Sequence, residues 1–175
     1  MSRVEMLRTV DAPVEDVFHF TEWCYNGPEW MPFVQKAWIT ELPGPDGLGG
    51  GTHYVGEMMG KEETWEATST KFEANTLWAG KATAGDPAKM NMGAEVRFRE
   101  VGPGKTEVRI AMSYKVPYPV VGWFLDRFYV RRDVRKMVEG MVEGIERAAA
   151  QSRIPSLAIQ LKKREEDYPG YQAQK

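Results

Sequence analysis

The stretch MNMGAEVRFREVGPGKTEVRIAMSY, residues 90–114, decides the fold class of this 175-residue chain. Apolar and polar residues alternate on both sides of Gly102-Pro103-Gly104, which is a strong turn signal. This period of two predicts a long antiparallel hairpin with one buried and one exposed face. The buried face is expected to carry Met90, Met92, Ala94, Val96 and Phe98 on the first strand, and Val108, Ile110, Met112 and Tyr114 on the second.

On the N-terminal side of this hairpin, the sequence predicts further strands and two short helices. Residues 13–21 have helical spacing, with Pro13 suited to a first turn and with Glu15 and Asp16 favourable near a helix N-terminus. A second helical turn is predicted at 28–31. The remaining predicted strands are 3–10, 33–41, 52–59, 63–72 and 76–83.

After Pro117 and Pro119, an uninterrupted amphipathic pattern predicts one long helix over about 120–151. Its apolar half includes Phe124, Val134 and Val138, and it contains no proline. Gly140 and Gly144 fall toward the polar side of the helical wheel, so the sequence does not identify them as a helix-packing motif.

The order of elements predicts an α+β fold, in which a curved antiparallel sheet of six to seven strands grips one long C-terminal helix. A domain is expected over residues 1–151, followed by a polar C-terminal tail over 152–175. Within this tail a short docked helix is possible from Ile154 to Leu161, whereas Lys162-Lys163-Arg164 and the acidic run after it are expected to be solvated. A gap between sheet and helix is the natural place for a pocket.

Composition excludes several classes of function. The net charge of −2 gives no reason to expect a nucleic acid as partner, and no stretch is apolar enough to span a membrane. Cys24 is the single cysteine, which excludes an internal disulfide and favours a reducing, cytoplasmic setting. His19 and His53 are the only histidines and have no ligand-like spacing, so neither a metal nor a cofactor is predicted. His19 is expected on the surface of the helix 13–21.

Several motifs carry a resemblance to a known family. They are Val10-Asp11-Ala12-Pro13-Val14-Glu15-Asp16-Val17-Phe18, Trp30-Met31-Pro32-Phe33-Val34, Gly49-Gly50-Gly51-Thr52, Trp65-Glu66-Ala67 and the segment 121–132. With these motifs the chain resembles the START-like or SRPBCC superfamily, nearest its polyketide cyclase/dehydrase and coenzyme-Q-binding branch. The resemblance implies the helix-grip fold and a hydrophobic ligand. It transfers no catalytic residue.

The candidate ligand-binding residues combine large apolar side chains with two arginines. Arg127 and Arg131 lie on or within the apolar half of the helix, so they either hold an acidic or carbonyl head group in the pocket, or reach solvent or a sheet carboxylate. The other candidates, which also pack a core, are Trp65, Trp78, Met92, Phe98, Met112, Tyr114, Phe124, Val134 and Val138.

The sequence leaves three functions open. The first is binding or carriage of a small hydrophobic molecule such as a lipid, a quinone or a polyketide-like aromatic. The second is a cyclase- or dehydratase-like enzyme in which Tyr114, Arg131 or His53 assists proton transfer. The third is a protein-interaction module with a vestigial pocket, whose tail binds a partner or a second copy in a possible homodimer. The absence of a convergent acid–base set favours binding.

Overall fold

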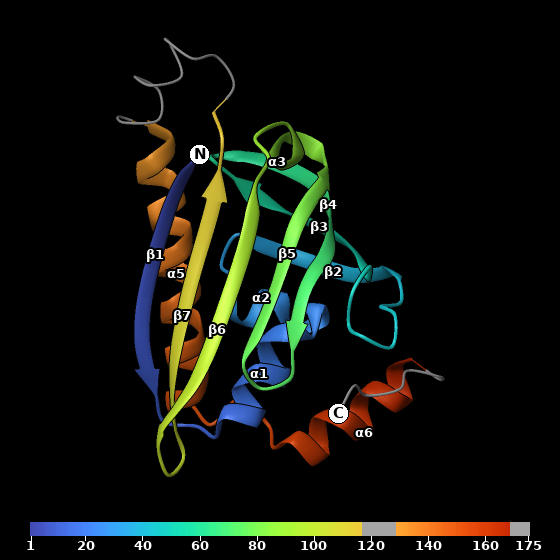
Figure 1. Ribbon diagram of the computed structural model, residues 1–175, viewed down its shortest axis with the longest axis vertical. Helices are drawn as coiled ribbons and strands as arrows, with labels where there is room; N and C mark the ends of the chain where they lie inside the picture. The colour runs from blue at the N-terminus through green and yellow to red at the C-terminus, as the bar shows by residue number, and fades with distance from the viewer. Residues whose placement is uncertain (117–128, 169–175) are drawn as a thin grey trace.

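The computed structural model describes residues 1–116 and 129–168 and contains a seven-stranded antiparallel sheet (Figure 1). The strands follow the order β1-β7-β6-β5-β4-β3-β2, so β1 and β2 form the two edges. Their bounds are β1 Ser2–Val10, β2 Val34–Glu41, β3 Gly51–Met58, β4 Lys61–Glu73, β5 Leu77–Ala84, β6 Gly93–Gly102 and β7 Lys105–Tyr114. The predicted α+β helix-grip fold is thereby confirmed.

The helices gather on the concave face of this sheet. The long helix α5, Arg131–Ala150, packs along β1 and β7, and the short helix α2, Gly27–Trp30, lies against both α5 and β2 (Figure 1). The remaining helical elements are α1 Val14–Glu22, the 3₁₀ turn η1 Cys24–Asn26, α3 Gly85–Lys89 and α6 Leu157–Asp167. The helix α6 packs on α1 at the lower end of the molecule.

Most predicted elements are found within one or two residues of the expected bounds. Two differences concern the entry to β6. This strand begins at Gly93, because α3 and the turn after it occupy residues 85–92 and take Met90 out of the strand pattern. The helix α3 was not predicted. The predicted first turns of the long helix, 120–128, lie outside the described residues, while its C-terminal end at Ala150 agrees with the prediction.

The core lies between the inner face of the sheet and the apolar stripe of α5. Val134, Val138, Met141 and Ile145 recur at helical spacing and are almost fully buried. They face inward residues of the hairpin such as Ile110. The alternation in the sequence therefore does set which face of the hairpin is buried.

The two helix glycines correct one sequence expectation, because both serve close packing. A Cβ atom at Gly144 would lie 2.1 Å from the carbonyl oxygen of Trp30, and one at Gly140 would lie 2.7 Å from Cγ of Pro32. The α2 segment therefore crosses α5 with its backbone nearly touching the helix. The wheel placed these glycines near the polar side because the wheel shows polarity and not the path of a neighbouring segment.

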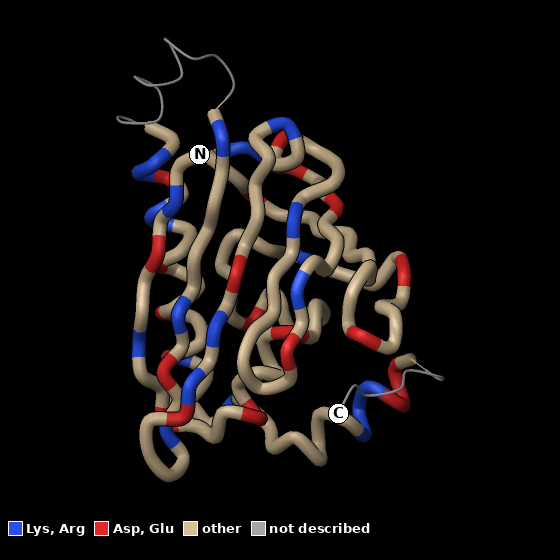
Figure 2. Tube along the Cα trace, in the orientation of Figure 1, with Lys and Arg blue, Asp and Glu red and all other residues tan. Residues whose placement is uncertain are grey.

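Charged residues of both signs are distributed along the strands of the sheet (Figure 2). Glu95 lies at the centre and accepts ion pairs from Arg3, Lys71 and Arg97 at 3.0–3.3 Å. Partial burial alone would raise the pKa of the Glu95 carboxyl, but these three cations together lower it to about 2. No described helix has the length and apolar character needed to cross a membrane.

Candidate functional site

An apolar cavity of about 90 Å³ lies between the middle of the sheet and α5; we refer to it as the chamber. Its walls are mostly methionine and aromatic side chains, and methionine adapts readily to ligands of irregular shape. The principal wall residues are Met31, Phe33, Tyr54, Met58, Trp65, Trp78, Met92, Met112 and Met141. Its composition is that expected of a pocket for a hydrophobic ligand.

The chamber exists because neighbouring strands place small residues opposite one another on the inner face. Ala67 of β4 pairs with Ala82 of β5, and Gly80 of β5 pairs with Ala94 of β6. All four line the chamber. Side chains this small cannot reach α5, so space remains between the two layers. This cluster of small residues was visible in the sequence but becomes meaningful only once the strand register is known.

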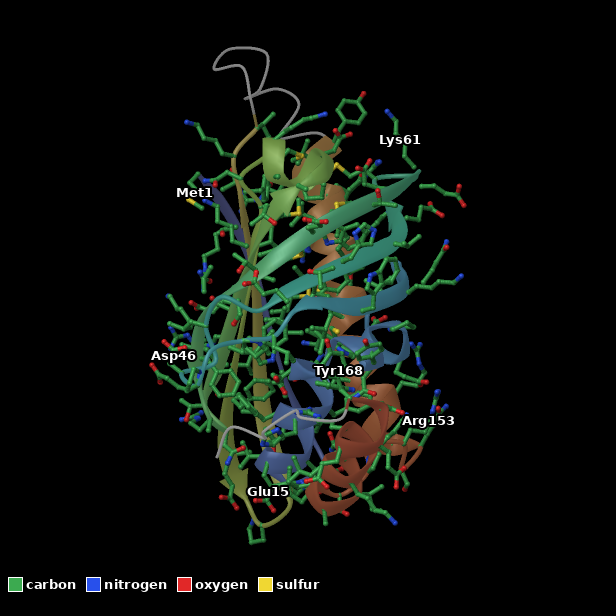
Figure 3. The ribbon with its side chains drawn as sticks, turned by 90° about the vertical axis from the view of Figure 1, so that its right-hand side faces the viewer. Met1, Glu15, Asp46, Lys61, Arg153 and Tyr168 are labelled. Atoms are coloured by element: carbon green, nitrogen blue, oxygen red, sulfur yellow. The ribbon has the colours of Figure 1, made fainter. Side chains whose placement is uncertain are left out.

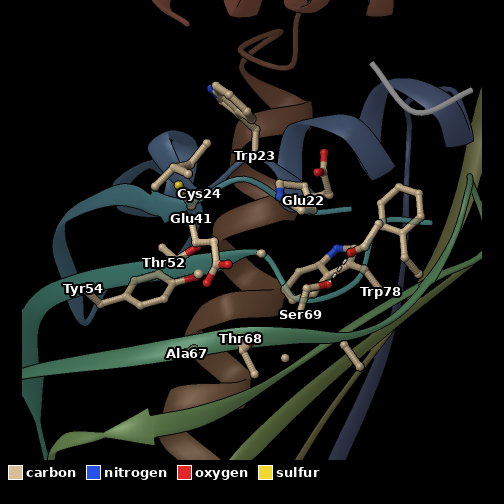
Figure 4. A pocket seen from close by; sticks show the side chains of 18 residues that line it. Glu22, Trp23, Cys24, Glu41, Thr52, Tyr54, Ala67, Thr68, Ser69 and Trp78 are labelled. Carbon is tan, nitrogen blue, oxygen red and sulfur yellow. Dashed lines mark hydrogen bonds between the residues drawn. The ribbon is translucent and has the colours of Figure 1, made fainter. Parts of the chain in front are cut away.

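A second cavity of about 100 Å³, which we call the vestibule, lies beside the chamber (Figure 4). It is formed by the end of α1, η1, the loop 42–50 and the neighbouring ends of β2 to β5. Its polar lining residues are Glu22, Cys24, Glu41, Thr52, Tyr54, Thr68 and Ser69. The loop is fixed to β4, because the Ser69 hydroxyl donates to the Gly47 carbonyl at 2.8 Å and Gly49 N–H donates to the Ser69 carbonyl at 3.0 Å.

The chamber and the vestibule share one wall, made of Tyr54, Ala67, Trp78 and Gly80. The Tyr54 ring stacks on Trp65 with centroids 5.2 Å apart. The Trp78 indole donates to the Thr21 hydroxyl of α1 at 3.2 Å. The two cavities are thus neighbours that share four lining residues, two of which are aromatic.

Beside this wall the vestibule carries the Cys24 thiol and the Thr52 hydroxyl, which remain protonated like the Tyr54 phenol. Burial raises the pKa of the Cys24 thiol to about 12, although Thr52 hydrogen-bonds to it, and burial also raises the pKa of the Tyr54 phenol. A protonated thiol is a poor nucleophile. The cluster of Cys24, Thr52 and Tyr54 is therefore suited to hydrogen bonding rather than to covalent catalysis.

The helix α6 fixes the α1 side of the vestibule through a buried arginine, which corrects the expectation that Arg164 is solvated. Arg164 is 1% exposed; its Nη1 lies 2.9 Å from Oε2 of Glu22, and its Nη2 donates to the His19 carbonyl. Its guanidinium carbon lies 4.5 Å from the ring centroid of Trp23. Glu22 and Trp23 are themselves vestibule residues, so the tail holds part of the site in place.

The helices α6 and α1 lie beside each other (Figure 3), and their interface has further contacts. Leu157 N–H donates to the Asp16 carboxylate at 2.7 Å, and Gln160 Nε2 donates to the Asp16 carbonyl at 3.0 Å. Outside the interface, Arg153 pairs with Glu29 on the surface. The described part of the predicted polar tail is therefore docked on its own domain.

His19 corrects a second expectation, because it was predicted on the helix surface and is only 7% exposed. It lies between α1 and the Arg164 cluster, with Nδ1 3.9 Å from the Glu22 carboxylate. Burial, together with the nearby Arg164 charge, lowers the pKa of His19 to about 4.

This lowered pKa makes stability depend on pH. Between pH 6.5 and 4 the unfolded chain binds a proton at His19 that the native chain does not, so the stabilisation is complete above pH 6.5 and is lost as the pH falls toward 4. The loss amounts to about 3 kcal/mol in all, of which about 2 kcal/mol is lost by about pH 5. Urea unfolding of the wild type and of His19→Gln at about pH 7 and about pH 5 measures it.

The His19→Gln variant is expected to lose less stability between these two pH values than the wild type does. Glu22 is present in both proteins, so its own titration cancels from the comparison to first order. His53→Gln is the matched control and should keep the wild-type pH dependence. An equal pH dependence in wild type and His19→Gln would contradict the prediction.

The structure separates the candidate residues into two groups. Trp65, Trp78, Met92 and Met112 line the chamber. By contrast, Phe98, Tyr114, Val134 and Val138 are buried in the hydrophobic core and are not among the described residues that line either cavity. Phe98, for example, packs edge-to-face on Phe18 with centroids 5.3 Å apart. Tyr54, which lines both cavities, is not among the candidates from the sequence.

Arg131 follows the second of the two alternatives left open for it. It is exposed and lines a groove between β1 and α5, together with Arg3, Arg8 and Arg135, away from the chamber and the vestibule. Phe124 and Arg127 lie outside the described residues. Arg131 is therefore not placed to hold the acidic head group of a molecule in either cavity.

Other polar candidates are also separated from the cavities. His53 stacks on Trp38 at 4.4 Å and has Nδ1 3.6 Å from the Glu66 carboxylate. It alternates with Thr52 and Tyr54 along β3, so it belongs to the opposite face of the sheet. In residues 1–116 and 129–168, no three His, Cys, Asp or Glu side chains cluster closely enough to hold a metal ion.

Comparison with known proteins places this architecture in a family. Residues 1–150 match the model of the family described as polyketide cyclase / dehydrase and lipid transport. The chain belongs to this family. Within it the chain has the START-like, SRPBCC type of fold that its sequence motifs indicated. No curated protein matches the chain.

Solved structures agree with the fold at low sequence identity. A protein from Thermus thermophilus, TTHA0849, is 18% identical with a TM-score of 0.71, covering 86% of this chain and 99% of the other. A START superfamily protein from Mycobacterium smegmatis is 17% identical with a TM-score of 0.70, covering 86% and 98%. The Zhui aromatase/cyclase from a Streptomyces species is 15% identical with a TM-score of 0.64, covering 84% and 94%.

Proposed function

We propose that this protein binds or carries a small hydrophobic molecule in the joined space of the chamber and the vestibule. The observation that carries this proposal is the wall shared by Tyr54, Ala67, Trp78 and Gly80, because it places an apolar methionine-lined space directly beside a polar one. Ligand sites of this kind combine large apolar area with a few hydrogen-bonding groups.

Native mass spectrometry of the purified protein, followed by denaturing extraction, tests the proposal. A bound apolar molecule at a ratio near one per chain supports it. A clean mass of the protein alone, combined with no thermal shift across a panel of lipids, quinones and aromatic polyketides, contradicts it.

Ala67→Phe is expected to abolish retention of such a ligand, since Ala67 lines both cavities and a benzyl group there would fill the space between them. The affinity should fall at least about a hundredfold, because the new phenyl ring would occupy the volume that the ligand needs. The native mass and a calorimetric titration measure the loss, and circular dichroism verifies the fold.

Thr64→Phe is the matched control, because Thr64 lies on the same strand, is exposed and belongs to the opposite face. It should leave binding unchanged. Equal affinities of the Ala67→Phe variant and the wild type would place the ligand elsewhere.

A cyclase or dehydratase acting in the same cavities is the second candidate function. The observation in its favour is the protonated Tyr54 beside Thr52, which could donate a proton to a bound carbonyl. Incubating the extracted molecule with the protein separates the two functions. An unchanged mass with an unchanged chromatographic retention time supports binding alone, an unchanged mass with a new retention time marks cyclisation, and loss of one water marks dehydration.

A further inference from the structure

The charge of the vestibule favours a particular chemical class of ligand. Its described lining contains two carboxylates, Glu22 and Glu41, and no lysine, arginine or histidine. Glu22 is paired with Arg164, whereas Glu41 is exposed at the mouth. In Figure 4 the Glu41 carboxylate is directed toward Thr52 and Tyr54. An anionic group entering here would meet Glu41 with no described cation on the wall to offset it.

The hydrogen-bonding groups of the vestibule suit a neutral or cationic polar end. Thr52 can donate and accept, Tyr54 carries a hydroxyl, and Glu41 can only accept when ionised. A hydroxyl or an ammonium group could donate to Glu41, and a hydroxyl could also accept from Thr52. An ionised carboxylate or phosphate has no proton to donate to Glu41 and would be repelled by its negative charge, which disfavours binding.

The volumes bound the size of the apolar body. The chamber has about 90 Å³ and the vestibule about 100 Å³. An apolar cavity of about 150 Å³ holds one benzene ring. Each cavity alone is therefore too small for a ring, whereas the two together, at about 190 Å³, have room for one ring or at most a fused pair and not for a two-chain lipid. The aromatic walls, with Tyr54 stacked on Trp65, also match a flat body.

We propose that the ligand is a neutral or cationic molecule of one to two rings, with its body in the chamber and a hydrogen-bond-donating end in the vestibule at Thr52, Tyr54 and Glu41. The inference rests on the proposed function and narrows it. It differs from the acidic head group expected at Arg131, which lines a different groove.

Three naphthalene probes of equal shape test the inference: 2-naphthol, 2-(aminomethyl)naphthalene and 2-naphthoate. Isothermal titration calorimetry at about pH 7.5 gives the affinities. Methyl NMR then reports occupancy of the chamber from Met31, Met58, Met92, Met112 and Met141, which all line it. The naphthol and the amine are expected to bind and to shift these methyl signals, with naphthoate at least about tenfold weaker. A four-ring alcohol, 1-pyrenemethanol, is expected not to bind.

Two variants identify the group responsible. Glu41→Gln should reduce the ratio of the naphthol affinity to the naphthoate affinity at least about threefold, because it removes the carboxylate at the mouth that no described cation neutralises. Glu57→Gln is the matched control, since Glu57 is an exposed carboxylate of β3 that alternates with the inward Met58. It should leave this affinity ratio unchanged.

The possible failures are distinguishable. Naphthoate binding as tightly as naphthol, or pyrenemethanol binding equally well, would overturn the ligand class and leave the proposed function standing. An unchanged ratio of naphthol to naphthoate affinity in Glu41→Gln would also overturn the ligand class. If no probe binds and no methyl signal shifts, the ligand class fails, and the native mass with the thermal-shift panel decides the proposed function separately.

Discussion

Replacing Arg164 by alanine is expected to lower the free energy of unfolding by about 3–5 kcal/mol, the usual cost of removing one partner from a buried ion pair. The guanidinium is almost fully buried and contacts Glu22, the His19 carbonyl and the Trp23 ring. Without it, the Glu22 carboxylate stays buried beside His19 with no compensating charge. Chemical denaturation measures the loss, and the melting temperature should fall by about 10 °C or more.

Arg153→Ala is the control for this prediction, because Arg153 forms an ion pair with Glu29 on the surface. Pairs of that kind contribute about 0–1 kcal/mol. Adding Glu22→Gln to the Arg164→Ala variant should recover part of the loss, since a neutral amide leaves no buried charge behind. If Arg164→Ala and Arg153→Ala were equally mild, α6 would not hold α1 in the way described.

The second large effect is expected from Gly144→Ala. On an exposed helix this change would stabilise by about 1 kcal/mol through higher helix propensity. Here the added methyl would lie 2.1 Å from the Trp30 carbonyl oxygen, a backbone atom that can move only if α2 moves. We expect a net loss of about 2–3 kcal/mol in unfolding free energy, as is typical of overpacked sites.

Gly140→Ala gives a graded comparison, because its methyl would meet the Pro32 side chain at 2.7 Å and only more distant atoms beyond it. Its loss should be smaller than that of Gly144→Ala. Glu143→Ala, an exposed change on the same helix, should stay within about 0.5 kcal/mol of the wild type. Urea unfolding of the three variants tests the order, and a stabilising Gly144→Ala would contradict it.

The fold was largely predictable because it rests on periodicities that the sequence shows directly. The alternation around Gly102-Pro103-Gly104 gave the hairpin with its buried face, and the stripe through Val134 and Val138 gave the inner side of α5. These patterns show which side of each helix or strand faces water and which side faces the core. They do not record which element lies opposite, so the contact of Gly144 with Trp30 was missed.

The candidate site was predictable only in part for the same reason. Trp65 and Met92 were expected on the inner face and line the chamber. Whether a large inward side chain faces a cavity or another side chain depends on strand register, which placed Phe98 against Phe18 instead. Arg164 lies in a run of charges that is solvated on most proteins, and only its contacts with distant residues such as Glu22 reveal its burial.

The docking of α6 has a consequence for where this protein can be cut. The family match ends at residue 150, yet Glu22 and Trp23 of the vestibule are fixed by a side chain at position 164. The segment of chain that holds the candidate site in place is therefore longer than the segment that matches the family model. A chain ending at residue 150 would keep every family motif and the whole sheet, but it would leave the Glu22 carboxylate and the Trp23 indole without their clamp. Domain boundaries taken from the family alone are thus expected to yield a protein with the same sheet and a less firmly held vestibule.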